Sequence, residues 1–343
     1  MTKKKIVVFG ELLMRLNTSG FERFLQAENF EVRYTGGEAN AGMSLVNYGM
    51  EAYVVSKVPD NEIGQACINY LRRFGLNTDF IVRGGERLGL FYHETGVAQR
   101  ASKIIYDRSN SAIRGSQLED YNWDNICSGK DWFHFSGTAP ALGDNVQRVL
   151  EDGLKTAKKQ RLTVSCDLNY RAKLWSSAEA KSAMTRLMPY VDVLIGNEED
   201  AEKVFGIKAE GSDVNRGKIV EGSYRQVTAQ LIRQFGFKKV ATTLRESISA
   251  STNGWAGVLY DGKKHFLSRK YEINPIVDRV GAGDSFTGGL IYGFLSGFSS
   301  QLCIEFAVAA SCLKHSIVGD FNLASIAEVE ALMTGNASGR IQR

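Results

Sequence analysis

The amino-acid sequence predicts an α/β protein with a central, mostly parallel β-sheet that is flanked by helices and carries a small β-sheet lid. Short β-branched, apolar segments recur at residues 6–10, 52–58, 80–82, 132–136, 163–167, 191–196, 239–244 and 257–260. Helical patterns lie between several of them, at residues 39–48, 63–74, 145–159, 178–188, 198–205 and 224–235, and two more follow near 283–295 and 300–316. Many strands are apolar throughout, which is typical of a parallel sheet covered on both faces.

Two segments interrupt this alternation, residues 15–35 and 88–111, and neither carries a helical pattern. The second alternates between apolar and polar residues over 88–93 and again over 103–106, with a turn expected at 95–98. We therefore expect residues 13–35 and 87–112 to form an inserted β-sheet lid. Residues 1–12, 36–86 and 113–343 would then form the α/β domain that binds nucleotide and substrate.

Composition excludes several classes of function. The 343 residues include 42 Lys and Arg against 38 Asp and Glu, so the net charge of +4 does not favour nucleic-acid binding. Five cysteines without a CxxC pair and four scattered histidines indicate a reduced protein without a zinc site. The apolar run at 6–10 is too short for a signal peptide, and no stretch approaches the ~20 apolar residues of a membrane helix. We expect a cytoplasmic protein that binds no membrane.

The motif with the clearest chemistry is the Gly281-Ala282-Gly283 turn that precedes Asp284 and an apolar helical stretch. Backbone N–H groups at such a turn bind anions, and the helix dipole adds to that preference. A carboxylate in the first turn can accept the proton of a hydroxyl nucleophile while those N–H groups hold a phosphate. An acidic residue at this position is also common simply because it complements the helix dipole, so spacing alone leaves both interpretations open.

A second loop enters a helix through Gly36 and Gly37, followed by Asn40. Paired glycines allow the backbone to approach a polar ligand, and the Asn side chain offers both a donor and an acceptor. For this pair taken alone, a plain glycine turn is the simpler explanation. The chain contains neither G-x-G-x-x-G nor a Walker A sequence, which argues against a dinucleotide-binding dehydrogenase and against a P-loop kinase.

Polar residues follow two predicted strands, at the edge of an α/β sheet where ligands usually bind. Asp167 and Arg171 follow the first, and the guanidinium could hold a carboxylate or a phosphate. Asn197, Glu199 and Asp200 follow the second, where acidic residues could organise Mg²⁺ through water. A strand-end salt bridge and helix-dipole complementation are the simpler explanations.

The predicted lid carries Tyr106 and Arg108, which lie two residues apart and therefore point to the same face of a strand. That face suits a sugar with an acid group, although an exposed strand face would look the same. Phe91 or Tyr92 on the other lid strand could contact the same substrate, and the pattern does not distinguish them.

Taken together, these motifs resemble those of the ribokinase-like carbohydrate kinases, the phosphofructokinase-B family. Gly36-Gly37 with Asn40 resembles its N-terminal glycine signature, and residues 278–284 resemble its C-terminal D-T-x-G-A-G-D signature. The likeness covers the chain from residue 6 to the 320s. Within the family, residues 106–112, 167–171 and 314–322 are most similar to those of 2-keto-3-deoxygluconate kinases.

The resemblance implies a sugar-acid kinase that transfers the ATP γ-phosphate to the 6-hydroxyl of 2-keto-3-deoxy-D-gluconate, with Mg²⁺ as cofactor. Asp284 would be the base, and the N–H groups of Gly281, Ala282 and Gly283 would form the anion hole. The resemblance further implies sugar contacts from Gly36, Gly37, Asn40, Phe91, Tyr106, Arg108, Asp167 and Arg171. Nucleotide contacts would come from Asn197, Thr243, Arg245, Lys314 and Asn322. Glu199 or Asp200 would bind Mg²⁺ through water. Asp278 would lie near a monovalent cation such as K⁺.

Three positions depart from the family pattern. Arg279 replaces the threonine of the C-terminal signature, Asp200 stands where glutamate is expected, and Arg245 stands where a glycine is expected. A kinase of fructose, ribose or another small sugar therefore stays an alternative, as does a sugar-acid-binding regulator without catalysis. The edges of the lid sheet need covering, so we also expect a homo-oligomer assembled through the lid.

Overall fold

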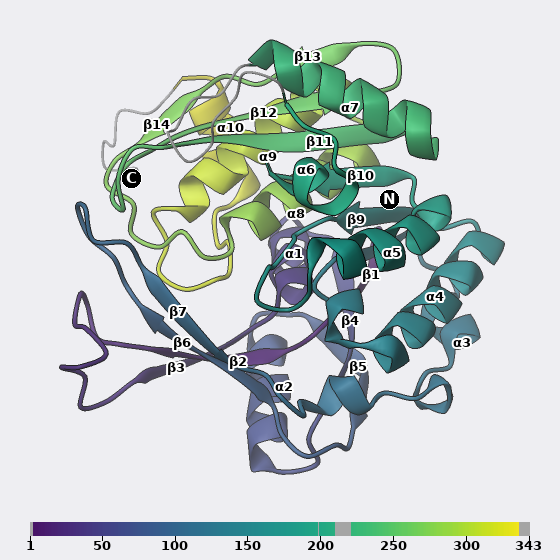
Figure 1. Ribbon diagram of the computed structural model, residues 1–343, viewed down its shortest axis with the longest axis vertical. Coiled ribbons are helices and arrows are strands. Elements are labelled where there is room, and N and C mark those ends of the chain that lie inside the picture. Colours follow the sequence, from purple (N-terminus) through teal and green to yellow (C-terminus); the bar gives the residue numbers. More distant parts are fainter. Residues whose placement is uncertain (1–2, 198, 210–220, 336–343) are drawn as a thin grey trace.

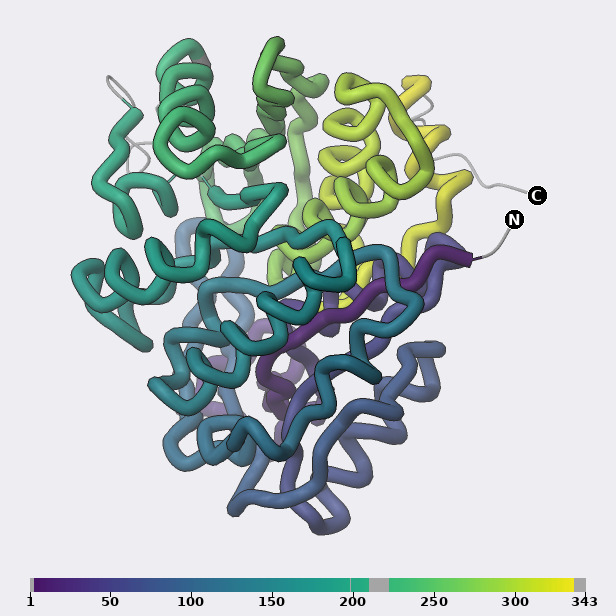
Figure 2. The backbone as a smooth tube through the Cα atoms, turned by 90° about the vertical axis from the view of Figure 1, so that its right-hand side faces the viewer, coloured from purple at the N-terminus to yellow at the C-terminus, as the bar shows by residue number. Residues whose placement is uncertain are grey.

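Ten strands form the main sheet in the part of the chain that the computed structural model describes, residues 3–197, 199–209 and 221–335. Their order is β13-β12-β11-β10-β9-β8-β1-β4-β5, and β14 pairs with β12. The strands are β1 (Lys5–Phe9), β4 (Glu51–Val58), β5 (Asn77–Arg83), β8 (Trp132–Ser136), β9 (Thr163–Asp167), β10 (Val193–Gly196), β11 (Lys239–Ser247), β12 (Asn253–Tyr260), β13 (His265–Leu267) and β14 (Tyr271–Ile273). β1 lies inside the sheet between β8 and β4, and Figure 2 shows its purple segment crossing the body.

The sheet is parallel from β5 to β11 and antiparallel from β11 onward. This arrangement confirms the predicted mostly parallel α/β sheet. All eight predicted main-sheet strands are present, with ends that differ by a few residues. The sequence did not indicate β13 and β14, because strands of three residues are too short to display a period.

Helices cover both faces of the sheet, as Figure 1 shows. One hydrophobic core includes side chains of α1 (Gly37–Asn47), α2 (Glu62–Arg73), α8 (Ala282–Leu295) and α9 (Ser300–Lys314). A second includes those of α3 (Trp123–Cys127), α4 (Asp144–Lys159), α5 (Ser177–Leu187), α6 (Asp200–Phe205) and α7 (Glu221–Phe235). Helix α10 (Ile326–Met333) packs on α9, and short 3₁₀ helices occur at η1 (Ala112–Gly115), η2 (Leu118–Asp120), η3 (Pro140–Leu142) and η4 (Met188–Tyr190). In the described chain, no helix has the length and apolar character needed to cross a bilayer.

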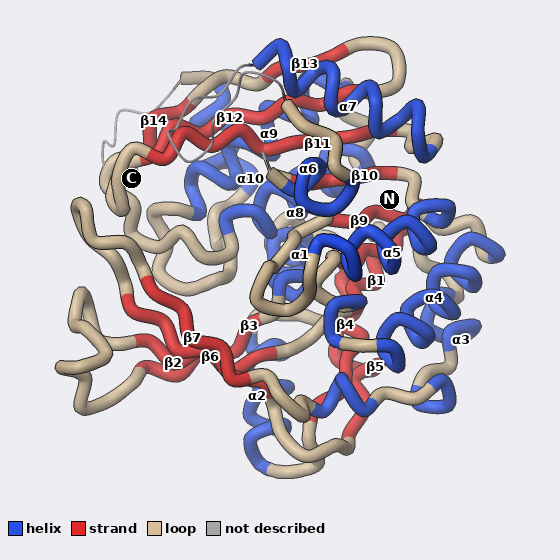
Figure 3. Tube along the Cα trace, viewed as in Figure 1, coloured by secondary structure: helices blue, strands red, loops and turns tan. Residues whose placement is uncertain are grey.

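A separate small sheet contains β2 (Leu13–Asn17), β3 (Glu31–Thr35), β6 (Gly89–Glu94) and β7 (Lys103–Asp107), in the order β3-β2-β6-β7. Figure 3 shows its red strands extending away from the main body. It lies within the segments predicted to form the lid, and the connection between β6 and β7 is longer than the predicted turn at 95–98. The domain boundaries themselves stay a prediction.

The two faces of the small sheet differ in character because side chains alternate along each strand. One cross-strand row contains Arg33, Arg15, Phe91 and Tyr106. The neighbouring row, on the opposite face, contains Val32, Leu16, Tyr92 and Ile105. Phe91 and Tyr106 line a cavity of the main body, whereas Val32 and Ile105 are 51% and 54% exposed. The inner row therefore contributes to the site, and the outer row is largely apolar and in part open to solvent.

Candidate active site

A cavity of about 610 Å³ lies where the carboxyl ends of β9 and β10, the amino ends of α1 and α8, and the inner face of the small sheet meet. Parallel strands end on the same edge of a sheet, which explains why segments far apart in sequence converge here. Sixteen predicted site residues line the cavity: Gly36, Gly37, Asn40, Phe91, Tyr106, Arg108, Asp167, Arg171, Asn197, Asp200, Thr243, Arg245, Gly281, Ala282, Gly283 and Asp284.

Asp284 occupies the first turn of α8 and is held by a short chain of hydrogen bonds. Asn40 Nδ2 donates to Asp284 Oδ2 over 2.7 Å. Asn40 Oδ1 in turn accepts from the hydroxyl of Thr35 over 2.8 Å, which fixes which way the carboxamide faces. The oxygen and nitrogen of Asn40 are thus assigned by their partners, and the carboxylate is oriented toward the cavity by α1.

The electrostatics of Asp284 suit proton transfer near neutral pH. Burial raises its pKa to about 7, the hydrogen bond from Asn40 opposes that rise, and the nearby Glu38 carboxylate adds to it. Burial, with Asp200 and Asp284 close by, likewise raises the pKa of Asp167 to about 8. Carboxyl groups clustered in one cavity with raised pKa values are typical of functional sites.

Steric crowding requires glycine at Gly281 but not at Gly37 or Gly283. Gly281 has φ of 84°, in the left-handed region, and a Cβ there would lie 2.0 Å from the carbonyl oxygen of Asp320. Gly37 faces Asp284, because a Cβ there would lie 3.5 Å from Asp284 Oδ1. A Cβ on Gly283 would meet nothing within 4 Å. The backbone at the start of α8 is therefore tightly packed against Asp320 at Gly281, and it is open at Gly283.

Arg108 is buried, and its charge is balanced by a residue that the sequence did not single out. Its Nε donates to Glu11 Oε2 over 2.7 Å, and its Nη2 contacts the same oxygen. The guanidinium also lies 5.3 Å from the ring centre of Tyr106. An ion pair of this kind fixes the position of Arg108 at the cavity wall.

The structure separates the two lid aromatics that the sequence could not distinguish. Phe91 lines the cavity and its ring centre lies 5.8 Å from that of Tyr106, whereas Tyr92 packs against Phe30 on the other face. Arg171 lies at the cavity wall, exposed, with a hydrogen bond of 3.0 Å from its Nη1 to the carbonyl oxygen of Tyr170.

Asn197 and Asp200 line the cavity and also organise the start of α6. Asn197 Oδ1 accepts from the backbone N–H groups of Glu199 and Asp200, and Asp200 carboxylate oxygens accept from the N–H groups of Asn197 and Tyr170. Each Asp200 carboxylate oxygen therefore accepts one backbone hydrogen bond. In the described residues, no three His, Cys, Asp or Glu side chains gather to hold a metal.

Four predicted site residues lie outside the cavity lining: Glu199, Asp278, Lys314 and Asn322. Asn322 is buried between Tyr48 and the backbone of Ala324. Lys314 is fully buried and donates to two backbone carbonyls. Neither side chain lines the cavity, so a nucleotide contact from either residue stays a prediction. Asp278 is engaged by other parts of the protein, as described below.

Sequence reasoning missed a further set of lining residues, which includes Glu11, Glu38, Thr138, Asn169, Lys173, Asn253, Trp255, Arg279, His315 and Asp320. Glu38 had a local signal, because it lies between the paired glycines and Asn40. Its buried carboxylate accepts from the backbone and hydroxyl of Ser136, at 3.1 and 2.5 Å. Four others lie within stretches that the sequence had already singled out: Asn169 in 167–171, Arg279 in 278–284, and His315 and Asp320 in 314–322. The rest come from separate segments, and the sequence gave no sign that they meet.

Comparison with known proteins gives a consistent result. Residues 3–322 match the model of the family described as pfkB family carbohydrate kinase. The crystal structure of 2-dehydro-3-deoxygluconokinase from Thermotoga maritima superposes with a TM-score of 0.93 at 49% identity, covering 97% of this chain and 99% of the other. A 2-dehydro-3-deoxygalactonokinase from Haloferax volcanii is 29% identical over 98% of both chains, and a 2-dehydro-3-deoxygluconokinase from Thermoproteus tenax is 29% identical over 96% of this chain and 94% of its own.

Proposed function

The chain belongs to the pfkB family of carbohydrate kinases, and we propose that it transfers the γ-phosphate of ATP to the 6-hydroxyl of 2-keto-3-deoxy-D-gluconate. This sugar acid is the substrate named, as 2-dehydro-3-deoxygluconate, for the relatives from T. maritima and T. tenax. The observation that carries the proposal is the position of Asp284, which is held by Asn40 at the amino end of α8, in a cavity whose wall also contains Arg108 and Arg171.

In this proposal, Asp284 is the general base. Its carboxylate accepts the proton of the sugar hydroxyl as that oxygen bonds to the γ-phosphorus, the bond from phosphorus to the bridging oxygen breaks, and ADP leaves. Its pKa of about 7 matches this role, because proton transfer is most effective when the pKa of the base is near the working pH. The N–H groups of Gly281, Ala282 and Gly283 would stabilise the charge that develops on the phosphoryl oxygens.

The acid end of the sugar would be held by Tyr106, Arg108 and Arg171. A guanidinium binds a carboxylate through charge-assisted hydrogen bonds. Because Glu11 balances the charge of Arg108, the preference for an acidic sugar over a neutral one would come chiefly from Arg171. Gly36, Gly37 and Asn40 would contact hydroxyl groups, Asp167 would contact the sugar from the end of β9, and Phe91 would pack against its carbon atoms. All of these residues line the same cavity.

The nucleotide would occupy the part of the cavity bordered by Asn197, Thr243 and Arg245. Mg²⁺ would arrive with the phosphates and neutralise their charge, with Asp200 holding its water ligands. Arg279, which replaces a threonine of the family signature, adds a further cation beside this region: its Nη2 donates to the carbonyl oxygen of Ala250 over 2.6 Å.

One alternative substrate has a specific observation in its favour. The H. volcanii relative is named for 2-dehydro-3-deoxygalactonate, a sugar acid of the same class, and it matches 98% of this chain. The two arginines of the cavity wall, Arg108 and Arg171, here called the arginine wall, would bind both acids equally, since the acids share the carboxylate. Discrimination between them depends on contacts to the sugar hydroxyls.

We also propose a homo-oligomer assembled through the outer face of the small sheet. Val32, Leu16, Tyr92 and Ile105 form one cross-strand row there, and the two outer members are about half exposed. Burying such a row against a second copy would remove apolar surface from water and cover the edge strands β3 and β7.

The test is an assay of ADP release with Mg-ATP and a panel that contains 2-keto-3-deoxygluconate, 2-keto-3-deoxygalactonate, gluconate, fructose and ribose. Preference for the first compound supports the proposal as stated, and preference for the second changes only the epimer. Preference for fructose or ribose would overturn the role of the arginine wall and leave the kinase assignment intact. Binding of a sugar acid without turnover would indicate a regulator.

A further inference from the structure

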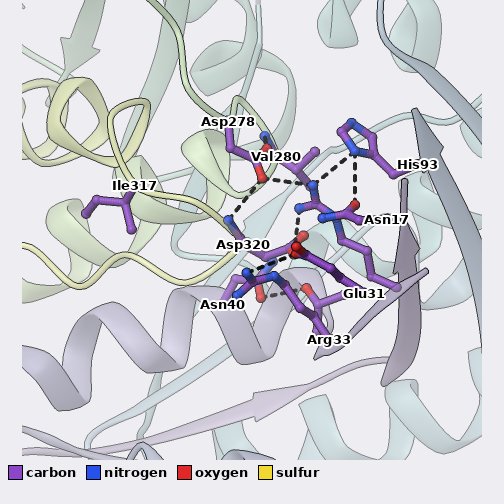
Figure 4. Close-up of polar contacts among 12 residues, drawn as sticks. Asn17, Glu31, Arg33, Asn40, His93, Asp278, Val280, Ile317 and Asp320 are labelled. Carbon is purple, nitrogen blue, oxygen red and sulfur yellow. Dashed lines mark hydrogen bonds and ion pairs between the residues drawn. The ribbon is translucent and has the colours of Figure 1, made fainter. Parts of the chain in front are cut away.

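Arg15 of the small sheet is fully buried and connects that sheet to the loop before α8. Its Nη2 donates to Asp278 Oδ2 and its Nη1 to Asp320 Oδ2, both over 2.8 Å. Its Nε donates to Asn17 Oδ1 over 2.7 Å. Figure 4 shows the two aspartates on neighbouring loops around this network, with His93 and Asn17 on the other side. A guanidinium in this position holds two loops of the main body to one strand of the small sheet.

Lys314, at the end of α9, places a second cation beside the same loop. The side chain is 0% exposed, and its Nζ donates to the backbone carbonyl oxygens of Asp278 and Ile317, each over 3.1 Å. A buried ammonium that contacts carbonyl oxygens is arranged like a monovalent metal ion, since K⁺ is also bound by carbonyl oxygens in place of its hydration water. Lys is the side chain that comes closest to such a compact point charge.

Both carboxylate oxygens of Asp278 are engaged by the protein itself. Oδ1 accepts from the N–H of Val280 over 3.0 Å, and Oδ2 accepts from Arg15 and from the N–H of Gly319 over 3.0 Å. Val280 immediately precedes the glycine turn, and Gly281 packs directly on the backbone of Asp320. The Asp278 carboxylate and the two cations around it therefore determine where the N–H groups of that turn lie.

Family resemblance placed a monovalent cation beside Asp278, and the residues present do not fit one. We propose that Lys314, together with Arg15, is the built-in cation of the loop before α8, so that this protein needs no monovalent metal ion there. The carbonyl oxygens that would ligate a metal receive the Lys314 ammonium, and the carboxylate that would neutralise it is paired with Arg15. Both side chains act as positioning residues for the glycine turn.

The charge balance of the cluster supports this assignment. Two cations, Arg15 and Lys314, face two carboxylates, Asp278 and Asp320, so the charges of these four directly connected groups cancel. His93, whose Nδ1 lies 3.0 Å from Arg15 Nη2, is neutral at pH 7 because burial and Arg15 lower its pKa to about 4. A metal ion added here would leave an uncompensated positive charge in a buried region, which is strongly unfavourable.

The first test measures cation binding on the whole protein without substrate, so that it is independent of the proposed reaction. Thermal unfolding is recorded while KCl, NaCl or tetramethylammonium chloride is varied at constant ionic strength. We expect the three curves of Tm against concentration to coincide. A saturable rise in Tm that is specific to K⁺ or Na⁺ would show that the native protein binds a metal ion and would overturn the proposal.

The second test removes the internal cation. Lys314→Ala opens space between the two carbonyl oxygens, and we expect K⁺ or NH₄⁺ to raise its Tm saturably and to restore a large part of its lost turnover. Lys159→Ala, which removes a 77% exposed lysine from α4, should show no such response. A folded Lys314→Ala protein that does not respond to either cation would contradict the assignment. If that variant does not fold, the titration of the unmodified protein decides by itself.

Discussion

Asn40 Nδ2 and Asp284 Oδ2 lie 2.7 Å apart, although the two residues are separated by 244 positions in the sequence. This hydrogen bond joins the first turn of α1 to the first turn of α8. It connects the two glycine-rich loops that the sequence singled out separately, and it orients the carboxylate proposed as the base. Together with the charge of Arg171, it also opposes the rise in the pKa of Asp284.

Replacing the proposed base should abolish most of the activity and leave the fold intact. We expect Asp284→Asn to lower kcat by about 10²–10⁴-fold, the usual loss when a positioned general base is removed.

The stability of this variant follows from the same pKa. Burial raises the pKa of Asp284 to about 7, above its ordinary value of 3.8. The ionised carboxylate therefore lowers the stability of the fold above pH 7, and this destabilisation fades as the pH falls toward 3.8. The variant should therefore unfold at pH 8 at a Tm no lower than that of the unmodified protein. Asp124→Asn, at an exposed position, is the matched control. Near-full turnover in Asp284→Asn would refute its assignment as the base.

The pH profile of the reaction should report the state of Asp284. We expect kcat/KM to fall as the pH is lowered through about 7, because the carboxylate must be ionised to accept a proton. In Asn40→Ala the hydrogen bond that favours the ionised form is lost, so this acidic limb should move to higher pH. The limb reports an apparent pKa, because Asp167 titrates nearby. An unchanged limb in Asn40→Ala would contradict the proposed role of that contact.

Substitution by alanine should lower activity at Gly37 and stability at the neighbouring Gly36. In Gly37→Ala the new methyl group would lie 3.5 Å from Asp284 Oδ1, where the sugar hydroxyl must approach, so kcat/KM should fall while Tm stays nearly unchanged. In Gly36→Ala it would lie 2.4 Å from the backbone oxygen of Glu11, so the protein itself should be destabilised. Paired thermal unfolding and kinetic measurements separate the two effects. Equal loss of Tm in both variants would show that Gly37 has a structural role instead.

The arginine wall should determine the preference for an acid. We expect Arg171→Met to reduce kcat/KM for 2-keto-3-deoxygluconate by about 10–150-fold, which corresponds to the ~1.5–3 kcal/mol of a hydrogen bond to a charged group. Arg171 is the better position for this test than Arg108, because replacing Arg108 would leave Glu11 buried without its ion pair. Arg148→Met, on the exposed surface of α4, is the control. Equal losses for the sugar acid and for fructose would argue against recognition of the carboxylate.

The outer face of the small sheet should control oligomeric state. Ile105→Lys places a charge on the proposed interface, at a side chain of the edge strand β7 that is 54% exposed in the single chain. We expect the particle mass measured by light scattering to fall by a whole-number factor, with little change in the far-UV circular dichroism spectrum. Ile248→Lys, at an exposed side chain outside the small sheet, should leave the mass unchanged. A mass that is the same before and after Ile105→Lys would rule out this face as the interface.

Local sequence patterns were sufficient to predict the fold class and many of the residues that line the cavity. The eight main-sheet strands were visible because side-chain periodicity and β-branched content are properties of short segments. Gly281 and Asp284 were found for the same reason, since a small-residue turn followed by an acidic residue determines the first turn of a helix locally. The strand-end residues Asp167 and Asn197 needed only the rule that parallel strands end at one edge of the sheet.

Only the tertiary structure decided which charges face one another. Lys314 was expected at the nucleotide, yet it points into the protein and contacts carbonyl oxygens of the loop before α8. Arg15 had no signal at all in the sequence, and Arg108 gave no sign of its partner Glu11, which lies 97 residues away. The physical reason is that a buried charge must be compensated by whichever group the fold brings near it, and that partner lies at a sequence distance that no local period encodes.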